Sequence, residues 1–267
     1  MAMVATAEAP VAAPKAFMRA VRRLLAKSDG EPLIAEADQK VNAGYVVTVS
    51  GVSIAVVPMP FAIPAGTLGT AIGNEYVWKD AGDTFIRSKG HFLISVVSPD
   101  IDASQRFNQA RLLTAVTAAV LSTSKGLGVF WQSADSVISP ARFLTQSKTV
   151  GADKTASELW FSLRFFPGSS DPNSDFLVCQ STGLAAFLGR EIECGPYAMT
   201  PAEIADTVIL VARYMATAGP VFGDGHTLGI AGTKEPDARI FFDWSTLGGM
   251  NKPIIQLRLM AQERVMQ

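Results

Sequence analysis

The chain has 267 residues, with 23 Lys and Arg against 24 Asp and Glu, which gives a formal charge of -1. This balance excludes nucleic-acid binding by bulk charge, because no excess positive field attracts a polyanion. Charged residues make up 18% and hydrophobic residues 48% of the chain, a composition that predicts a core-rich globular protein and excludes intrinsic disorder.

The N-terminal segment is predicted to be a tail with one helix. Residues 1–14 are rich in Ala and Pro and lack the basic start and continuous apolar core of a secretory signal. Residues 15–27 form a basic amphipathic pattern, in which Phe17 and Val21 alternate at helical spacing with arginines. We therefore expect residues 1–30 to be a flexible tail plus a short basic helix, which either packs on the domain or docks on a partner or an acidic membrane surface.

The number of cysteines indicates the cellular compartment, and the positions of the prolines and glycines indicate whether the chain spans a membrane. Cys179 and Cys194 are the only cysteines, too few for a disulfide framework and too far apart for a CxxC motif, so we expect reduced, buried thiols and a cytoplasmic location. Residues 41–74 carry no charge, but the prolines and glycines among them would break a spanning helix. No membrane span is expected.

The first half of the chain alternates strand and helix patterns. In chain order these are a hairpin over 45–57, a weak helix over 65–77, a strand over 91–97, a long helix over 102–121 and a strand over 129–131. Ser50-Gly51 provides the turn of the hairpin, and Asp102 with Gln105 resembles a capping box. The last strand, helix and strand predict a β-helix-β unit with a right-handed crossover.

The second half has a similar order of elements. It predicts a strand over 158–166, a pairing strand over 175–180, a helix from Thr200 to Gly219, and strands over 238–244 and 253–259. Thr200 and Glu203 form a capping box, Pro201 suits the first helical turn, and Gly219 ends the helix.

These elements predict an α+β fold with mixed or antiparallel sheets and two long packed helices. We expect a single domain over 31–267, with two similar β-α-β halves, 31–150 and 151–267, that share a sheet. The polar residues 150–157 are the predicted junction.

Several segments resemble the bacterial family catalogued as domain of unknown function 4261. They are His91-Phe-Leu-Ile-Ser-Val, Gly128-Val-Phe-Trp131, Glu158-Leu-Trp160, Thr182-Gly-Leu-Ala-Ala-Phe187 with Glu191-Ile-Glu193, and Gly223-Asp-Gly-His-Thr-Leu-Gly229. The last two are the more specific. The sequence departs from the pattern at Leu188-Gly189, where the glycine is expected directly after the phenylalanine. The family implies no activity, and its members are associated with bacterial toxin–immunity and specialised secretion genes.

Asp224, His226 and Thr227 form the most polar cluster. An Asp beside a His indicates acid–base or metal chemistry, but Asp224-Gly225 is equally the signal of a tight turn, which we favour. The second of the two histidines, His91, begins a buried strand, where a structural histidine is the favoured interpretation and a catalytic one the alternative.

Glu191 and Glu193 flank Ile192, so in a strand both carboxylates lie on one face, about 7 Å apart. This spacing suits acid–base work or cation binding, but we favour two exposed carboxylates on the solvent side of an edge strand. Thr182-Gly183 before a short apolar helix is a candidate anion-binding site, although it lacks the glycines and lysine of a phosphate loop. We expect no cofactor and no bound metal.

Two hypotheses for function follow. The first is a non-enzymatic binding module whose partner is another protein, with an immunity or adaptor role as one instance. The alternative is a small hydrolase or metal-assisted enzyme using Asp224, His226, Glu191 and Glu193, with His91 as a further candidate. Binding through Thr182, Gly183 and Thr227 is the associated prediction. The oligomeric state is left open.

Overall fold

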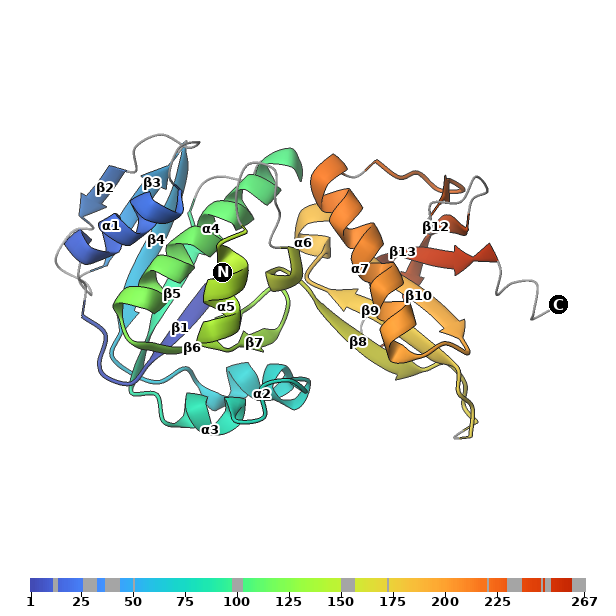
Figure 1. Ribbon diagram of the computed structural model, residues 1–267, viewed down its shortest axis with the longest axis horizontal. Coiled ribbons are helices and arrows are strands. Elements are labelled where there is room, and N and C mark those ends of the chain that lie inside the picture. Colours follow the sequence, from blue (N-terminus) through green and yellow to red (C-terminus); the bar gives the residue numbers. More distant parts are fainter. Residues whose placement is uncertain are drawn as a thin grey trace. The chain divides into compact units, whose positions relative to one another are not determined.

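The structure, a computed structural model of the chain, describes residues 1–11, 14–25, 33–36, 44–49, 51–97, 103–149, 157–171, 173–219, 221–229, 237–245, 247 and 251–260. The chain divides into two compact units, Met1–Trp160 and Phe161–Gln267. The fold is α+β with mixed and antiparallel sheets, as predicted (Figure 1). However, each unit has a sheet of its own, so the prediction that the two halves share a sheet is wrong.

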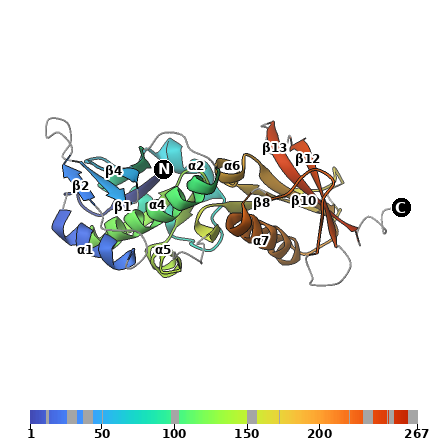
Figure 2. The same ribbon diagram turned by 90° about the horizontal axis from the view of Figure 1, so that it is seen from above.

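The described residues of the first unit form a seven-stranded sheet in the order β2-β3-β4-β5-β1-β6-β7. Its strands are β1 (Ala2–Thr6), β2 (Leu33–Glu36), β3 (Tyr45–Val49), β4 (Val52–Met59), β5 (Gly90–Val96), β6 (Gly126–Trp131) and β7 (Ser136–Ile138). The helices on one face are α1 (Pro14–Leu24), α4 (Ala103–Thr123) and α5 (Pro140–Ser147), and those on the other are α2 (Ala65–Gly73) and α3 (Ala81–Ile86) (Figures 1 and 2).

The first residues of the chain are a central strand, not a flexible tail. β1 lies between β5 and β6 and pairs with both in antiparallel register, Val4 opposite Phe92 on one side and Val129 on the other. Ala2, Val4 and Ala5 are fully buried. The prediction for residues 1–30 is therefore wrong at its start, because small apolar side chains suit the crowded middle of a sheet covered on both faces.

The hairpin and the β-helix-β unit follow the sequence pattern. β3 and β4 pair antiparallel around Gly51, which has a positive φ of 79° as the turn requires. β5 and β6 are both antiparallel to β1, so they run parallel to each other and α4 connects them. The strand between them is β1, which comes from the start of the chain and not from a neighbouring segment.

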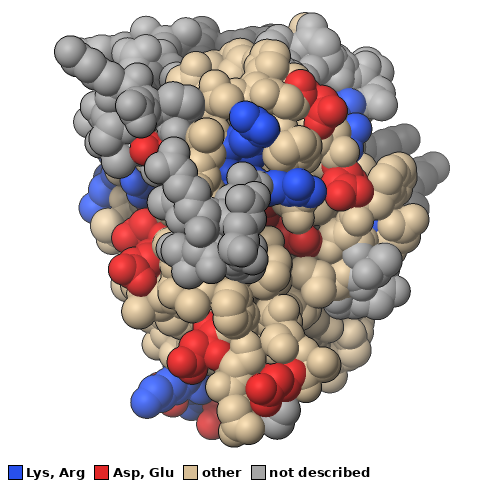
Figure 3. Space-filling model, turned by 90° about the vertical axis from the view of Figure 1, so that its right-hand side faces the viewer, with Lys and Arg blue, Asp and Glu red and all other residues tan. Residues whose placement is uncertain are grey.

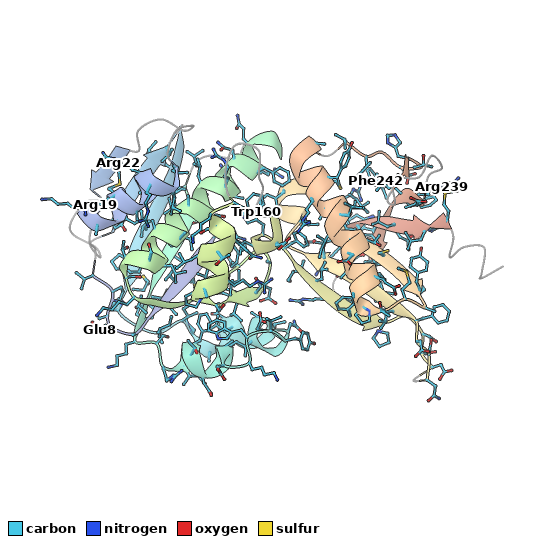
Figure 4. All side chains as sticks on the ribbon, viewed as in Figure 1. Glu8, Arg19, Arg22, Trp160, Arg239 and Phe242 are labelled. Atoms are coloured by element: carbon cyan, nitrogen blue, oxygen red, sulfur yellow. The ribbon has the colours of Figure 1, made fainter. Side chains whose placement is uncertain are left out.

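α4 is the central helix of the first unit, as its apolar circumference predicts. All residues from Leu112 to Leu121 are buried, and the helix contacts the sheet as well as α1 and α5. Asp102, the predicted cap, lies outside the described residues. Trp160 packs against α4, where its indole Nε1 donates to Thr114 Oγ1 at 2.9 Å (Figure 4). The predicted strand over 158–166 therefore begins only at Ser162, after a short 3-10 turn at Ser157–Leu159.

The described residues of the second unit form a six-stranded sheet in the order β11-β12-β13-β10-β9-β8. Its strands are β8 (Ser162–Pro167), β9 (Leu177–Thr182), β10 (Glu191–Tyr197), β11 (Thr227–Leu228), β12 (Ala238–Ser245) and β13 (Lys252–Leu259). β10 and β13 are parallel and the other pairs are antiparallel. The helices are α6 (Ala185–Leu188) and α7 (Pro201–Ala218).

α7 covers one face of this sheet. Its N-terminus carries the predicted capping box, in which Thr200 Oγ1 accepts from the Glu203 amide and Glu203 accepts from the Thr200 amide. Ile204, Val208 and further residues of the same stripe pack against the core side of β9, β10 and β13. Among the described residues, no helix is both long and apolar enough to cross a bilayer.

We predict that Val4→Asp abolishes the native fold of the first unit. A carboxylate at this position would be buried without a partner, and the cost of such a group is comparable with the roughly 5–15 kcal/mol that holds a typical domain folded. Thermal unfolding followed by circular dichroism measures the loss. The matched control is Val11→Asp, the same substitution at an exposed position seven residues later. Equal stability of the two variants would contradict a central β1.

Candidate functional site

The carboxylate of Glu191, at the start of β10, receives four hydrogen bonds from a single turn of the chain. Its Oε1 accepts from the amides of Gly183 (2.8 Å) and Ala185 (3.2 Å). Its Oε2 accepts from the Ser181 hydroxyl (2.6 Å) and from the Leu184 amide (3.1 Å). The side chain is only 5% exposed. Glu191 therefore acts as an internal acceptor that closes the turn between β9 and β10.

Ser181 completes this arrangement from the end of β9. Its hydroxyl donates to Glu191 and accepts from the Ile192 amide at 2.8 Å, so its hydrogen and one lone pair are both used. Gly183 has a φ of 115° and Gly189 a φ of 73°, conformations that favour glycine on either side of α6. Gly189, at the position where the sequence departs from the family pattern, is the left-handed C-cap of α6.

The anion-binding site predicted at Thr182-Gly183 is filled by the protein itself. The backbone amides after Gly183 point at a carboxylate, which is the chemistry expected of such a turn, but that carboxylate belongs to Glu191. Thr182 does not contribute its hydroxyl, because its Oγ1 is buried and has no hydrogen-bond partner among the described residues.

Glu193 takes part in a second buried network on the same face. Its Oε2 accepts from Gln180 Nε2 at 3.0 Å, and the same amide nitrogen donates to Ser245 Oγ at 3.0 Å. Glu193 is 9% exposed. The two glutamates share a face, as predicted, but the prediction of exposed carboxylates on an edge strand is wrong. β10 lies between β9 and β13, and hydrogen bonds from Gln180, Ser181 and the backbone let the polar face be buried.

Asp224 and His226 are held by backbone groups at the opposite side of the sheet. Asp224-Gly225 forms the predicted turn, with a φ of 79° at Gly225. Asp224 Oδ1 accepts from the Phe242 amide of β12 at 2.8 Å. His226 Nδ1 accepts from the Gly223 amide at 3.1 Å, so the neutral ring carries its proton on Nε2. Both side chains are exposed; Asp224 fixes the loop to β12, and His226 accepts a hydrogen bond from within the loop itself.

His91 lies in the first unit, in β5, and is buried. Its Nδ1 is 2.8 Å from the carbonyl oxygen of Phe61, and the Phe61 ring packs edge-on at 5.5 Å between ring centroids. Burial lowers the pKa of His91, and the hydrogen bond to Phe61 opposes part of this shift. These contacts describe a structural histidine that is neutral at pH 7.

The candidate catalytic residues of the second unit do not come together in one site. β13 lies between β10 and β12, so Glu191 and Asp224 are separated by at least two strand spacings, about 10 Å. Thr227, in β11, is four strand positions from Thr182, about 19 Å, so these two do not share a binding site. Within the described ranges, no three His, Cys, Asp or Glu side chains are grouped to hold a metal ion.

The two cysteines face each other across β9 and β10 and are free, as predicted. Burial raises the pKa of each thiol to about 12, so neither is a thiolate at neutral pH. Their side chains belong to the core beneath α7.

The sequence interpretation missed Gln180, Ser181 and Ser245. A signal for the first two was present, because β9 and β10 are joined by a short segment and must pair as a hairpin. In such a pair, polar residues near the end of one strand face those at the start of the next. No comparable local signal exists for Ser245, which lies 65 positions from Gln180.

We predict that Glu191→Ala destabilises the second unit by at least about 3 kcal/mol, because three amides and a hydroxyl lose their acceptor in a buried site. Urea unfolding followed by circular dichroism measures the change. Glu203→Ala is the control, since it removes an exposed glutamate that also accepts hydrogen bonds at a helix N-terminus. A loss no larger than that of the control would show that Glu191 does not stabilise the turn.

We also predict that His91 makes stability depend on pH. The folded pKa is lower than the unfolded value of about 6.5, so the unfolded chain binds more protons as the pH falls through this range. Stability should therefore be complete above pH 6.5 and fall towards pH 5. The measurement is the thermal midpoint across this range for wild type and His91→Asn, which keeps a polar side chain. An unchanged pH dependence in the variant would rule out His91 as its source.

Comparison with known proteins gives one family. The family described as Domain of unknown function (DUF4261) matches residues 180–240, which contain the two more specific segments of the resemblance and both buried glutamates. No curated protein and no solved structure matches the chain. The chain is therefore similar to DUF4261 over residues 180–240, from Gln180 of β9 to the start of β12.

Proposed function

We propose that the chain is a non-enzymatic protein-binding module of the bacterial cytoplasm, with an immunity or adaptor role as one instance. The candidate acid–base groups support this, because Glu191, Glu193 and Asp224 each accept hydrogen bonds from other groups of the chain. The free, opposed thiols of Cys179 and Cys194 support a reducing compartment.

The observation that carries the proposal is a group of exposed apolar side chains around α3. Tyr76, Val77 and Ile86 are 80%, 79% and 78% exposed. Single exposed apolar residues are common on protein surfaces, whereas contiguous ones mark interaction sites, and these three lie within eleven residues of the chain. Tyrosine is also among the residues that contribute most to binding energy at interfaces.

The backbone of this segment is held by hydrogen bonds and by the packing of Trp78. Glu75 Oε1 accepts from the amides of Val77 (2.7 Å) and Trp78 (2.8 Å). Trp78 packs against Phe85 and lies so close to Gly128 that a side chain there would collide with the indole. A rigid apolar surface loses little conformational entropy on binding, which favours affinity.

We predict that Tyr76→Ser/Val77→Ser reduces the retention of a native partner at least about tenfold, since a central aromatic contact is worth 2 kcal/mol or more. The measurement is a crosslinked pull-down from native lysate, quantified by mass spectrometry. The matched control is Leu210→Ser/Tyr214→Ser, which makes the same type of change on the exposed face of α7. A partner retained equally by both variants, or none retained by the wild type, would contradict the proposal.

A further inference from the structure

The outer face of α1 is a basic stripe formed by Lys15, Arg19, Arg22 and Arg23. All four are exposed, and the helix contains no acidic residue. The chain as a whole has a formal charge of -1, so this concentration of positive charge is local. For comparison, the face of the second unit in Figure 3 carries Lys and Arg interspersed with Asp and Glu.

The opposite face of α1 is fixed in the core of the first unit. Phe17, Val21 and Leu25 are buried, and the Phe17 ring lies 4.9 Å from the ring of Tyr45. The helix also packs on α4, at the outer side of the unit (Figure 2). The apolar side chains of α1 are therefore buried in the first unit, and its basic side chains are exposed. Figure 4 shows Arg19 pointing away from the unit.

The charge pattern of α1 opposes its own stability. Lys15 and Arg19, and again Arg19 and Arg23, are like charges at i,i+4, a spacing that destabilises a helix. Lys15 lies in the first turn, where the helix dipole favours an acidic residue and where this helix has none. Arg22 and Arg23 lie in the last turn, where the helix dipole favours them, so the unfavourable features are the i,i+4 pairs and Lys15 in the first turn. Local rules of this kind are broken mainly at functional sites.

The dimensions of the stripe limit what it can bind. From Lys15 to Arg23 the helix rises about 12 Å, the length of an extended segment of about four residues. A stripe this short neutralises too few phosphates for strong binding to duplex DNA, and a membrane would need the apolar side chains that are buried. Carboxylates on a short peptide match both its charge and its length.

We propose that the basic stripe of α1 binds an acidic segment of a protein partner. This proposal rests on the proposed function because it takes the partner to be a protein. Its surface is separate in sequence from Tyr76 and Val77, so the two can be tested independently. Lys15, Arg19 and Arg23 contact the carboxylates, and α4 with Tyr45 holds the helix in place.

The experiment measures binding of a fluorescein-labelled Glu-rich peptide to the purified full chain by anisotropy, at low and high salt. Two further arms use phosphatidylserine-containing vesicles and duplex DNA. The test variant is Arg19→Glu/Arg23→Glu. The matched control is Arg142→Glu/Lys148→Glu, which changes the net charge by the same amount. Both positions are exposed; Arg142 lies in α5 and Lys148 directly follows it.

We expect the wild type to bind the peptide with an affinity that falls as salt is raised, the test variant to bind about tenfold or more weakly, and the control to bind as the wild type. Equal weakening in both variants, no salt dependence, no peptide binding, or tighter binding to vesicles or DNA would overturn the proposal. Because the assay contains no lysate, such a result leaves the crosslinking test of the proposed function unaffected.

Discussion

The carboxylate of Glu191 and the amides of Gly183, Leu184 and Ala185 form the contact on which the matched family segment depends. A buried carboxylate is costly unless its lone pairs are used, and here one hydroxyl and three backbone amides use them. The same contact satisfies the amides that a helix start leaves without partners. It thereby joins the end of β9, α6 and the start of β10 into one unit.

The rest of the second unit is arranged around this turn. β10 carries Glu191 and Glu193 on one face and Ile192 and Cys194 on the other, where α7 packs. Each glutamate is matched by a polar residue of β9, so the strand can be central while one of its faces is polar. This division explains why the carboxylates that suggested chemistry in the sequence support the fold. The proposed recognition therefore uses exposed side chains elsewhere, on α1 and on the segment around α3.

Local signals in the sequence predicted the elements that depend on neighbouring residues. The capping box at Thr200, the hairpin at Gly51 and the turn at Asp224-Gly225 each need only a few adjacent residues to form, and all three are present. β1 was missed because its partners, β5 and β6, are supplied by segments far along the chain. Its five residues carry no turn or alternating pattern that would distinguish them from a tail.

The candidate site was predicted in part for the same reason. Strand alternation placed Glu191 and Glu193 on one face correctly. The amides that follow Thr182 do meet a carboxylate, but it is the side chain of Glu191 and not a ligand. Alternation alone does not distinguish a solvent face from a polar face that the protein covers and satisfies. The amides of this turn bond to Glu191 because β9 and β10 form a hairpin. The hairpin brings Gly183 into contact with Glu191, eight positions later.

The carboxylate of Glu191 is buried and bonded within the protein, so it is inaccessible in the native state. This can be measured by labelling the carboxylates of the native chain with a carbodiimide and an amine nucleophile, followed by peptide mass spectrometry. We expect the exposed Glu203 and Asp224 to be modified, and Glu191 to be protected until the protein is unfolded. Modification of Glu191 at the rate of Glu203 in the native protein would contradict it.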